Sequence, residues 1–266
     1  MINLAIAGAA GRMGRMLVAA CQQDDSVQVT HAIEVSGNPV IGQDCGDLSG
    51  VGTLGVAIDA ELNPAKFDIL IEFTNPASTL EHLEFCRQNY KSMVIGTTGL
   101  GKDDIKTLQD AAQSIPIVFA PNMSVGVNLT LKLLEMAARA LGTDADVEVI
   151  EAHHRHKVDA PSGTALRLGE AVAEAWGKDL QEIGVFERHG QIGPRPDGSI
   201  GFSTIRAGEI VGEHTVMFAT DGEILEITHK SVSRMNFANG AVRAARWLHG
   251  RPAGLFSMQD VLDLSK

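Results

Sequence analysis

The first half of the chain alternates short apolar runs with amphipathic segments. The apolar runs have the length and composition of buried parallel strands, and they cover residues 2–7, 27–33, 67–73, 93–95 and 117–119. Apolar residues at helical spacing predict helices around Leu17 and at about 78–88, 102–113 and 127–141. Residues 36–54 are rich in Gly, Asn, Pro and Asp, which predicts a surface loop with little regular structure. This alternation predicts an α/β domain with a parallel sheet.

The pattern changes after Gly142. The run 147–150 predicts a strand that ends at Glu151, and one clear helix is predicted from Ser162 to about Trp176. Residues 199–206, 213–219 and 224–229 alternate apolar and polar positions, with a hairpin turn predicted at residues 221–222. We therefore expect a second, α+β domain with a mixed or antiparallel sheet. The tail regains helical spacing at 236–248 and closes with a short segment around 261–262.

A glycine motif follows the first predicted strand. Gly8, Gly11 and Gly14 form G-x-x-G-x-x-G before a helix, and Glu34 ends the second strand 20 residues after Gly14. A dinucleotide fingerprint combines a strand, a glycine turn, a helix and an acid that binds the adenosine ribose. A tight turn and a surface acid explain the single features, but their combination favours a cofactor site. The predicted cofactor-binding residues here are Gly8, Ala9, Ala10, Gly11, Arg12, Met13 and Glu34.

The densest basic cluster of the chain lies at residues 153–157, HHRHK. Lysine and arginine attract anions, and histidine exchanges protons near neutral pH. Asp159-Ala-Pro161 then breaks the chain, and Ser162 is a predicted N-cap of a helix whose amino end favours a second negative group. These features suit a dicarboxylate that is protonated as it reacts. A solvated loop and a metal site of H-H-x-H spacing are the alternatives, and the fixed charges of Arg155 and Lys157 count against a metal.

Composition narrows the classes of partner. The 266 residues carry a net charge of −11, which opposes binding to nucleic acid or an anionic membrane. The three cysteines lack a C-x-x-C pattern, so we expect reduced thiols rather than disulfides. No apolar run approaches the ~20 residues of a membrane span, and the first residues lack a basic leader region. We therefore expect a cytoplasmic protein.

The segment EAHHRHKVDAPSGTA, residues 151–165, closely resembles the signature of the dihydrodipicolinate reductase family. The resemblance extends from the first strand to the final V-L-D-L. It implies reduction of 4-hydroxy-tetrahydrodipicolinate, a cyclic imine dicarboxylate of lysine and diaminopimelate synthesis, by hydride from NADH or NADPH. It further implies that His153 is a proton donor and acceptor and Lys157 a proton donor. The predicted substrate-binding residues are His154, Ser162, Gly163 and Thr164, while Arg155 and His156 are left as supporting residues.

The resemblance also implies the domain organisation. A Rossmann-like domain of residues 1–124 plus 234–266 binds the cofactor, and residues 125–233 bind the substrate and form a homotetramer. Two segments at the ends of later strands match family positions on the nicotinamide side of the cofactor. They are Gly96, Thr97 and Thr98, and Ala120, Pro121, Asn122 and Met123. No metal is expected.

Two other functions remain open at this point. One is a two-domain dehydrogenase that acts on an alcohol or amine, and the other is a module that senses NAD(H) without turnover. Both use the glycine turn, but neither explains a basic cluster directly before a helix start. Between the two cofactors we expect NADH to be favoured, because Glu34 repels a 2′-phosphate and Val35 stands where some relatives carry an arginine. Arg12 is the residue expected to offset that repulsion.

Overall fold

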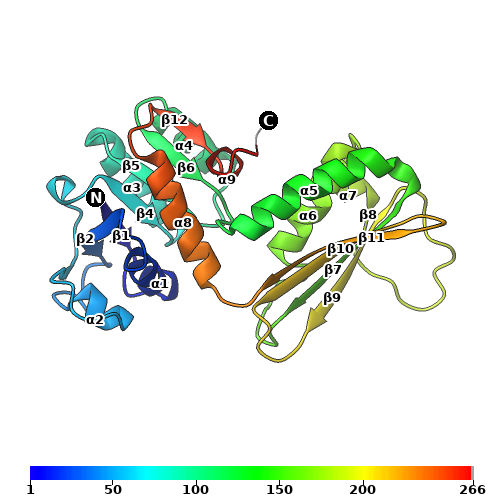
Figure 1. Cartoon of the computed structure of the whole chain (residues 1–266), viewed down its shortest axis with the longest axis horizontal. Helices are drawn as coiled ribbons and strands as arrows, with labels where there is room; N and C mark the ends of the chain where they lie inside the picture. Colours follow the sequence, from blue (N-terminus) through cyan, green and yellow to red (C-terminus); the bar gives the residue numbers. More distant parts are fainter. Residues whose placement is uncertain (265–266) are drawn as a thin grey trace. The chain divides into compact units, whose positions relative to one another are not determined.

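The computed structural model describes residues 1–264, which form two compact units. The first comprises Met1–Val125 together with the chain from Met235 on, and the second comprises Gly126–Arg234 (Figure 1). Within the described residues, none of the helices combines the length and apolar character that crossing a membrane requires. The three cysteines are buried free thiols.

The first unit contains a parallel sheet of seven strands in the order β12-β6-β5-β4-β1-β2-β3. The strands are β1 (Ile2–Ala7), β2 (Val27–Ile33), β3 (Ile58–Asp59), β4 (Ile69–Glu72), β5 (Ser92–Ile95), β6 (Pro116–Phe119) and β12 (Gly254–Phe256). β1 lies between β2 and β4, so the chain reverses its direction of winding there. In open α/β sheets, ligands bind at the carboxyl edge beside such a switch point.

Helices cover both faces of this sheet. They are α1 (Arg12–Cys21), α2 (Cys45–Ser49), α3 (Pro76–Gln88), α4 (Lys102–Ala111), α8 (Met235–Leu248) and α9 (Met258–Val261), with a 3-10 turn, η1, at Pro64–Lys66. Apolar residues of α1 and α8 share a core with one face, and those of α3 and α4 with the other. The tail thus returns to the first unit, where α8 packs beside α1 and β12 extends the sheet.

The second unit is a five-stranded mixed sheet in the order β11-β10-β7-β9-β8. Its elements are α5 (Val125–Leu141), η2 (Gly142–Asp144), β7 (Asp146–His153), α6 (Gly163–Ala175), α7 (Leu180–Ile183), β8 (Gly184–Val185), β9 (Ile200–Arg206), β10 (Gly212–Ala219) and β11 (Ile224–Ser231). β7 pairs parallel with β9 and antiparallel with β10, and β10 pairs antiparallel with β11. α5 and α6 pack on one face of the sheet (Figure 1).

The predicted fold class is confirmed, and the differences concern short elements. β7 does not end at Glu151 but continues to His153, because alternate residues from Val147 onward are buried and the Glu151 carboxylate is paired with Arg206 there. The predicted loop 36–54 contains α2, whose first turn is capped by the carboxylate of Asp44. β3, β8 and β12 have two or three residues each, too few for a hydrophobic period to be visible.

Candidate functional site

The turn after β1 is shaped by its glycines. Gly8 has φ +62°, and its carbonyl accepts a hydrogen bond of 2.9 Å from the Gly11 N–H. A Cβ on Gly14 would lie 2.2 Å from the Gly8 oxygen, so a side chain there would push α1 off the turn. The first amides of α1 therefore lie directly beside the turn. This is the backbone cradle that a pyrophosphate requires.

Glu34 lies beside this turn. Its carboxylate accepts a hydrogen bond of 3.2 Å from the Ala10 N–H and one of 3.0 Å from the Val35 N–H. The acid is thus fixed next to the glycine turn, although 24 residues separate it from Ala10. Val35 is 70% exposed, and Arg12 at the start of α1 is also exposed. The structure brings together the predicted ribose-binding acid and the predicted phosphate-binding turn.

In the segment after β5, Gly96 and Thr97 contact other residues of the first unit. A Cβ on Gly96 would lie 2.2 Å from the Phe73 ring, so the glycine makes room for that ring. Thr97 is 3% exposed, and its hydroxyl accepts hydrogen bonds from the Thr74 N–H at 3.1 Å and the Thr79 hydroxyl at 2.9 Å. Thr98 is exposed. Thr97 therefore holds the ends of neighbouring strands together. The groups of this segment that a ligand could contact are mainly those of the backbone.

The segment after β6 lies at the same edge of the sheet. The Ala120 N–H donates to the Ile95 carbonyl at 3.1 Å, which ties the segment to β5. Ala120 and Met123 are buried, Pro121 is exposed, and the Asn122 side chain accepts a hydrogen bond of 2.9 Å from the Ser124 N–H. The predicted nicotinamide-side residues thus follow two neighbouring strands, β5 and β6.

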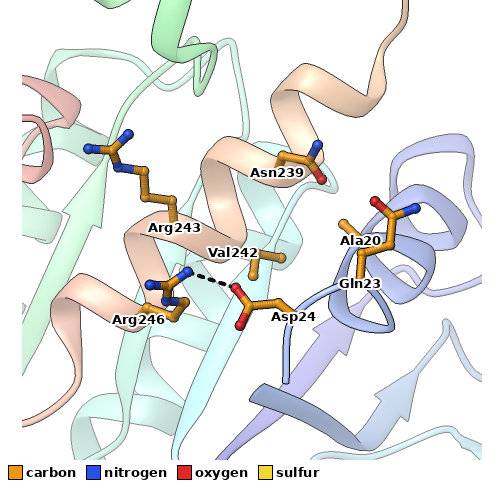
Figure 2. A pocket seen from close by; sticks show the side chains of 7 residues that line it. All are labelled: Ala20, Gln23, Asp24, Asn239, Val242, Arg243 and Arg246. Atoms are coloured by element: carbon orange, nitrogen blue, oxygen red, sulfur yellow. Dashed lines mark hydrogen bonds and ion pairs between the residues drawn. The ribbon is translucent and has the colours of Figure 1, made fainter. Parts of the chain in front are cut away.

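A hollow of about 480 Å³ lies elsewhere on the first unit, between α1 and α8. Figure 2 shows Arg246 of α8 reaching Asp24, at 2.9 Å, and Asn239 and Arg243 on the same helix also line the hollow. Asp24 follows the last turn of α1, so the hollow is a helix length, roughly 15 Å, from the glycine turn. It is large enough for a small molecule but shares no residue with the predicted cofactor site.

Glu151 is the centre of the second candidate site. It is 1% exposed, and both its oxygens accept hydrogen bonds of 2.8 Å from the guanidinium of Arg206. It also accepts from the Ser162 N–H at 3.0 Å and from His153 Nδ1 at 2.6 Å. Burial alone would raise its pKa, but the bonds from Arg206, His153 and the Ser162 N–H outweigh it and lower the pKa to about 2. Glu151 is therefore a buried carboxylate that stays ionised.

The position of Glu151 fixes the tautomer of His153. Because the carboxylate only accepts, the proton of the neutral ring lies on Nδ1, and Nε2 is the proton-accepting atom. Burial lowers the pKa of His153, against the opposing effect of Glu151, so the neutral ring prevails near pH 7. A Cβ on Gly212 of β10 would lie 3.0 Å from His153 Nε2, so glycine keeps space beside that nitrogen.

Ser162 links the start of α6 to a second histidine. Its hydroxyl accepts the Ala165 N–H at 3.1 Å as the N-cap and lies 3.1 Å from His214 Nε2. Burial lowers the pKa of His214 to about 4, so His214 is neutral and shares a hydrogen bond with the Ser162 hydroxyl. Ser162 is 2% exposed, whereas Gly163 is exposed and Thr164 partly so. The open part of this helix start is thus Gly163–Thr164.

Lys157 is held by a partner that the sequence did not reveal. Its Nζ lies 2.7 and 2.8 Å from the carboxylate oxygens of Asp159, and the hydrogen bond from Lys157 lowers the pKa of that carboxyl. Arg206 donates to the Asp159 carbonyl at 2.7 Å, which ties this loop to β9 and Glu151. His154 Nδ1 is buried and has no hydrogen-bond partner among the described residues. Lys157 and His153 are therefore each held by a carboxylate, whereas His154 is not.

The remaining residues of the basic cluster are peripheral. Arg155 and His156 are exposed, and His156 is 3.9 Å from the carboxylate of Glu209, itself exposed. Across residues 1–264, no three His, Cys, Asp or Glu side chains are grouped as a metal ion would need. Among the interactions of the described residues, the side chains of Arg155 and His156 do not join the Glu151 network.

Sequence reasoning missed the partners that position the cluster: Glu151, Asp159, Arg206 and His214. The strand pattern held a signal for three of them. In β7, Glu151 and His153 follow the same alternation as the buried Val147 and Val149. In the pairing register, Glu151 lies opposite His214 of β10, and His153 lies opposite Arg206 of β9. Polar residues in the buried phase of adjoining strands predict a polar network, but the strand order needed to apply this rule came from the structure.

Comparisons with known proteins give one consistent result. Residues 2–123 match the family model described as "Dihydrodipicolinate reductase, N-terminus", and residues 126–262 match "Dihydrodipicolinate reductase, C-terminus". The 4-hydroxy-tetrahydrodipicolinate reductase of Chromohalobacter salexigens is 60% identical over 99% of both chains.

Two solved structures share the fold. The dipicolinate-bound dihydrodipicolinate reductase of Paenisporosarcina sp. TG-14 has a TM-score of 0.76 at 23% identity, with 98% of each chain covered. An amine dehydrogenase from Mycobacterium smegmatis has a TM-score of 0.64 at 14% identity, over 97% of this chain and 95% of that one. At these identities the likeness concerns the fold alone.

Proposed function

The chain belongs to the dihydrodipicolinate reductase family, and from this premise we propose that it reduces 4-hydroxy-tetrahydrodipicolinate with hydride from a nicotinamide dinucleotide and a proton from the loop 153–157. The predicted family and reductase activity are confirmed by the relative of 60% identity. The observation that carries the protonation step is the network in which buried Glu151 orients His153 while Asp159 holds Lys157. The roles of the individual residues stay predictions.

The glycine turn would hold the dinucleotide. The N–H groups at the start of α1 would bind its pyrophosphate, Glu34 its adenosine ribose, and the segments after β5 and β6 its nicotinamide side. The cofactor supplies hydride when bound. The fit of a dinucleotide to this site is inferred from the shape of the turn, because a Cβ on Gly14 would fill the space beside Gly8.

Residues of the loop would bind and protonate the substrate. Its two carboxylates would meet the basic residues and the Gly163–Thr164 end of α6, where free amides favour anions. The hydroxyl group would leave as water together with a hydrogen from the adjacent carbon, hydride would add to one end of the conjugated system that results, and one proton at the other end would complete the reduction. Lys157 would donate that proton, since its ammonium is oriented by Asp159. His153 would accept a hydrogen bond or proton at Nε2 and share the resulting charge with Glu151.

We further propose that NADH is favoured over NADPH. The Glu34 carboxylate lies at the glycine turn, where a 2′-phosphate would meet its negative charge. Val35 beside it carries no charge to relieve the repulsion, and exposed Arg12 offers partial relief. Both cofactors are therefore used, with NADH the better.

The proposed assembly is a homotetramer formed through the second unit. The proposed location is the cytoplasm, where the buried thiols stay reduced. One face of the sheet of the second unit carries α5 and α6, while the other includes the 47% exposed Ile205 and the bonded Thr215–Thr228 pair. A sheet face of this kind is suited to cover by a second copy. Light scattering of the parent and of Ile205→Glu tests the assembly, and a monomeric parent at micromolar concentration rules it out.

The function is tested by following nicotinamide absorbance with freshly made 4-hydroxy-tetrahydrodipicolinate. We expect substrate-dependent oxidation of NADH and, more slowly, of NADPH. Turnover with an alcohol or amine but none with the cyclic imine would instead support the general dehydrogenase. Cofactor binding without turnover of any of these substrates would support the sensing module.

A further inference from the structure

A hydrogen-bonded pair in the first unit, formed by the buried Glu72 and by His82, takes no part in the chemistry described above. Glu72 ends β4, the strand beside β1, and is 0% exposed. One of its oxygens lies 2.5 Å from Nδ1 of His82 on α3, and the other accepts a short hydrogen bond from the Thr74 hydroxyl. A carboxyl group without solvent contact is costly to bury unless its oxygens have hydrogen-bond partners. Two partners on two different segments therefore hold one carboxylate.

Thr74 carries this restraint to the predicted cofactor site. Its N–H donates to the Thr97 hydroxyl at 3.1 Å, and the same hydroxyl accepts from Thr79 at 2.9 Å. On its other side, the Thr74 methyl group would lie 2.9 Å from a Cβ on Gly8, so it borders the glycine turn. Thr74 thus contacts the turn after β1 through its methyl group and the segment after β5 through its backbone N–H.

Stability alone is a poor explanation for the pair. An apolar pair of similar volume is often as stabilising as a buried ion pair, because desolvation offsets the attraction of the charges. What an apolar pair cannot do is fix the rotamer of a hydroxyl side chain. The residue that carries this hydroxyl contacts the two segments to which the proposed function assigns the pyrophosphate and the nicotinamide side.

We propose that Glu72 and His82 are positioning residues for the dinucleotide. Their hydrogen-bonded pair holds the Thr74 hydroxyl and thereby fixes the residue whose methyl group borders the glycine turn and whose N–H donates to Thr97, so that the cofactor meets a preformed site. The proposal rests on the proposed cofactor role of those segments. It concerns affinity for the cofactor, because Glu72 and His82 belong to the unit that carries the glycine turn, whereas the residues assigned to proton transfer belong to the second unit.

The test measures the Kd of NADH by calorimetry, with kcat, KM and Tm determined on the same samples. Thr74→Val keeps the shape of the side chain and removes the donor to Glu72, and Glu72→Gln removes the charge. We expect each to raise Kd and KM for NADH about 10-fold, the loss that follows from one charge-assisted hydrogen bond. The value of kcat at saturating NADH should stay within about 3-fold of the parent, since cofactor binding rather than chemistry is affected.

Two further variants distinguish the role of the Thr74 hydroxyl from a general effect on the stability of the protein. Thr74→Ser retains the hydroxyl and should bind NADH nearly as the parent does. Arg87→Gln breaks the exposed Glu84–Arg87 pair on the same helix, where the two side chains are 2.6 Å apart, and should leave Kd unchanged. If Glu72→Gln does not fold, the NADH affinities of Thr74→Val and Thr74→Ser still test the positioning role.

The double variant Glu72→Gln/Thr74→Val tests the route of the effect. If Glu72 acts through Thr74, the double variant should bind NADH no more weakly than the weaker single variant. Parent-like Kd in Thr74→Val, with or without a lower Tm, overturns the positioning role, and so do additive losses in the double variant. Failure of the parent to bind NADH or NADPH would overturn the proposed cofactor site itself, which keeps the two failures distinct.

Discussion

The two candidate sites are made from different parts of the chain. In the first unit the site is mainly backbone, since the glycines beside β1 leave amides exposed and Glu34 bonds to one of them. In the second unit the site is made of side chains, with Glu151 and His153 on one strand and Arg206 on the next. A backbone site depends on the path of the chain, whereas a side-chain site depends on individual charges.

The contrast predicts where each site is vulnerable. At the glycine turn the proposed binding groups are backbone N–H groups, so only substitutions that change the path of the chain should matter strongly. In the Glu151 network a buried charge has several partners, and removing one leaves the others without compensation. Single substitutions should therefore cost more activity in the second unit than in the first.

The largest effect is expected at the proton-transfer residues. Lys157→Ala and His153→Ala should each lower kcat by ~10²–10⁴, the usual contribution of a general acid or base, with the Kd of NADH nearly unchanged. Steady-state kinetics and calorimetry measure the two quantities. Lys132→Ala on α5, which loses only a 3.4 Å pair with Glu135, is the control. A variant that turns over at the parent rate removes its residue from the mechanism.

The first unit should be most sensitive at Gly14. Gly14→Ala places a Cβ 2.2 Å from the Gly8 carbonyl, so α1 must shift and both stability and NADH affinity should fall. Overpacking of this kind costs about 1–3 kcal/mol, measured by urea denaturation. Gly101→Ala is a matched control in the same unit, since the nearest atom to its Cβ would be 3.6 Å away. Equal behaviour of the two variants would contradict the close approach of α1 to the turn.

The side-chain site should also leave a signature in the pH dependence of stability. The pKa of His214 is lowered to about 4, so between pH 6.5 and 4 the unfolded chain binds a proton that the folded chain does not. The free energy of unfolding should consequently fall as pH drops from 7 to 5, by about 2 kcal/mol from this group. His214→Gln should flatten the slope, measured as urea midpoints, while the exposed His156→Gln should not. An unchanged slope in His214→Gln would show that other groups cause it.

The smallest effect is expected for cofactor choice. Val35→Arg adds a cation beside Glu34 and should raise the ratio of kcat/KM for NADPH over NADH about 10-fold, a difference of ~1.4 kcal/mol. Val35→Gln, polar but uncharged, is the control. A parent that already prefers NADPH would mean that Arg12 or another residue outweighs Glu34.

The sequence by itself determined the elements with long or repeated patterns. The apolar runs located β1 and β2 at their observed ends, and the glycine spacing with Glu34 indicated a nucleotide turn before any strand order was known. The signature at residues 151–165 indicated the family and the Ser162 cap. These features are local, because each depends on residues within one or two neighbouring elements.

Only the tertiary structure decided which residues surround the basic loop. Glu151, Arg206 and His214 come from three strands, and their meeting depends on the order β10-β7-β9 and its register. The same holds for Glu72, which meets His82 across a strand and a helix. Short strands such as β3 and β12 exist because neighbours complete their hydrogen bonds. Such contacts join segments far apart in the chain, and a pattern along one segment carries no information about the register that joins it to another.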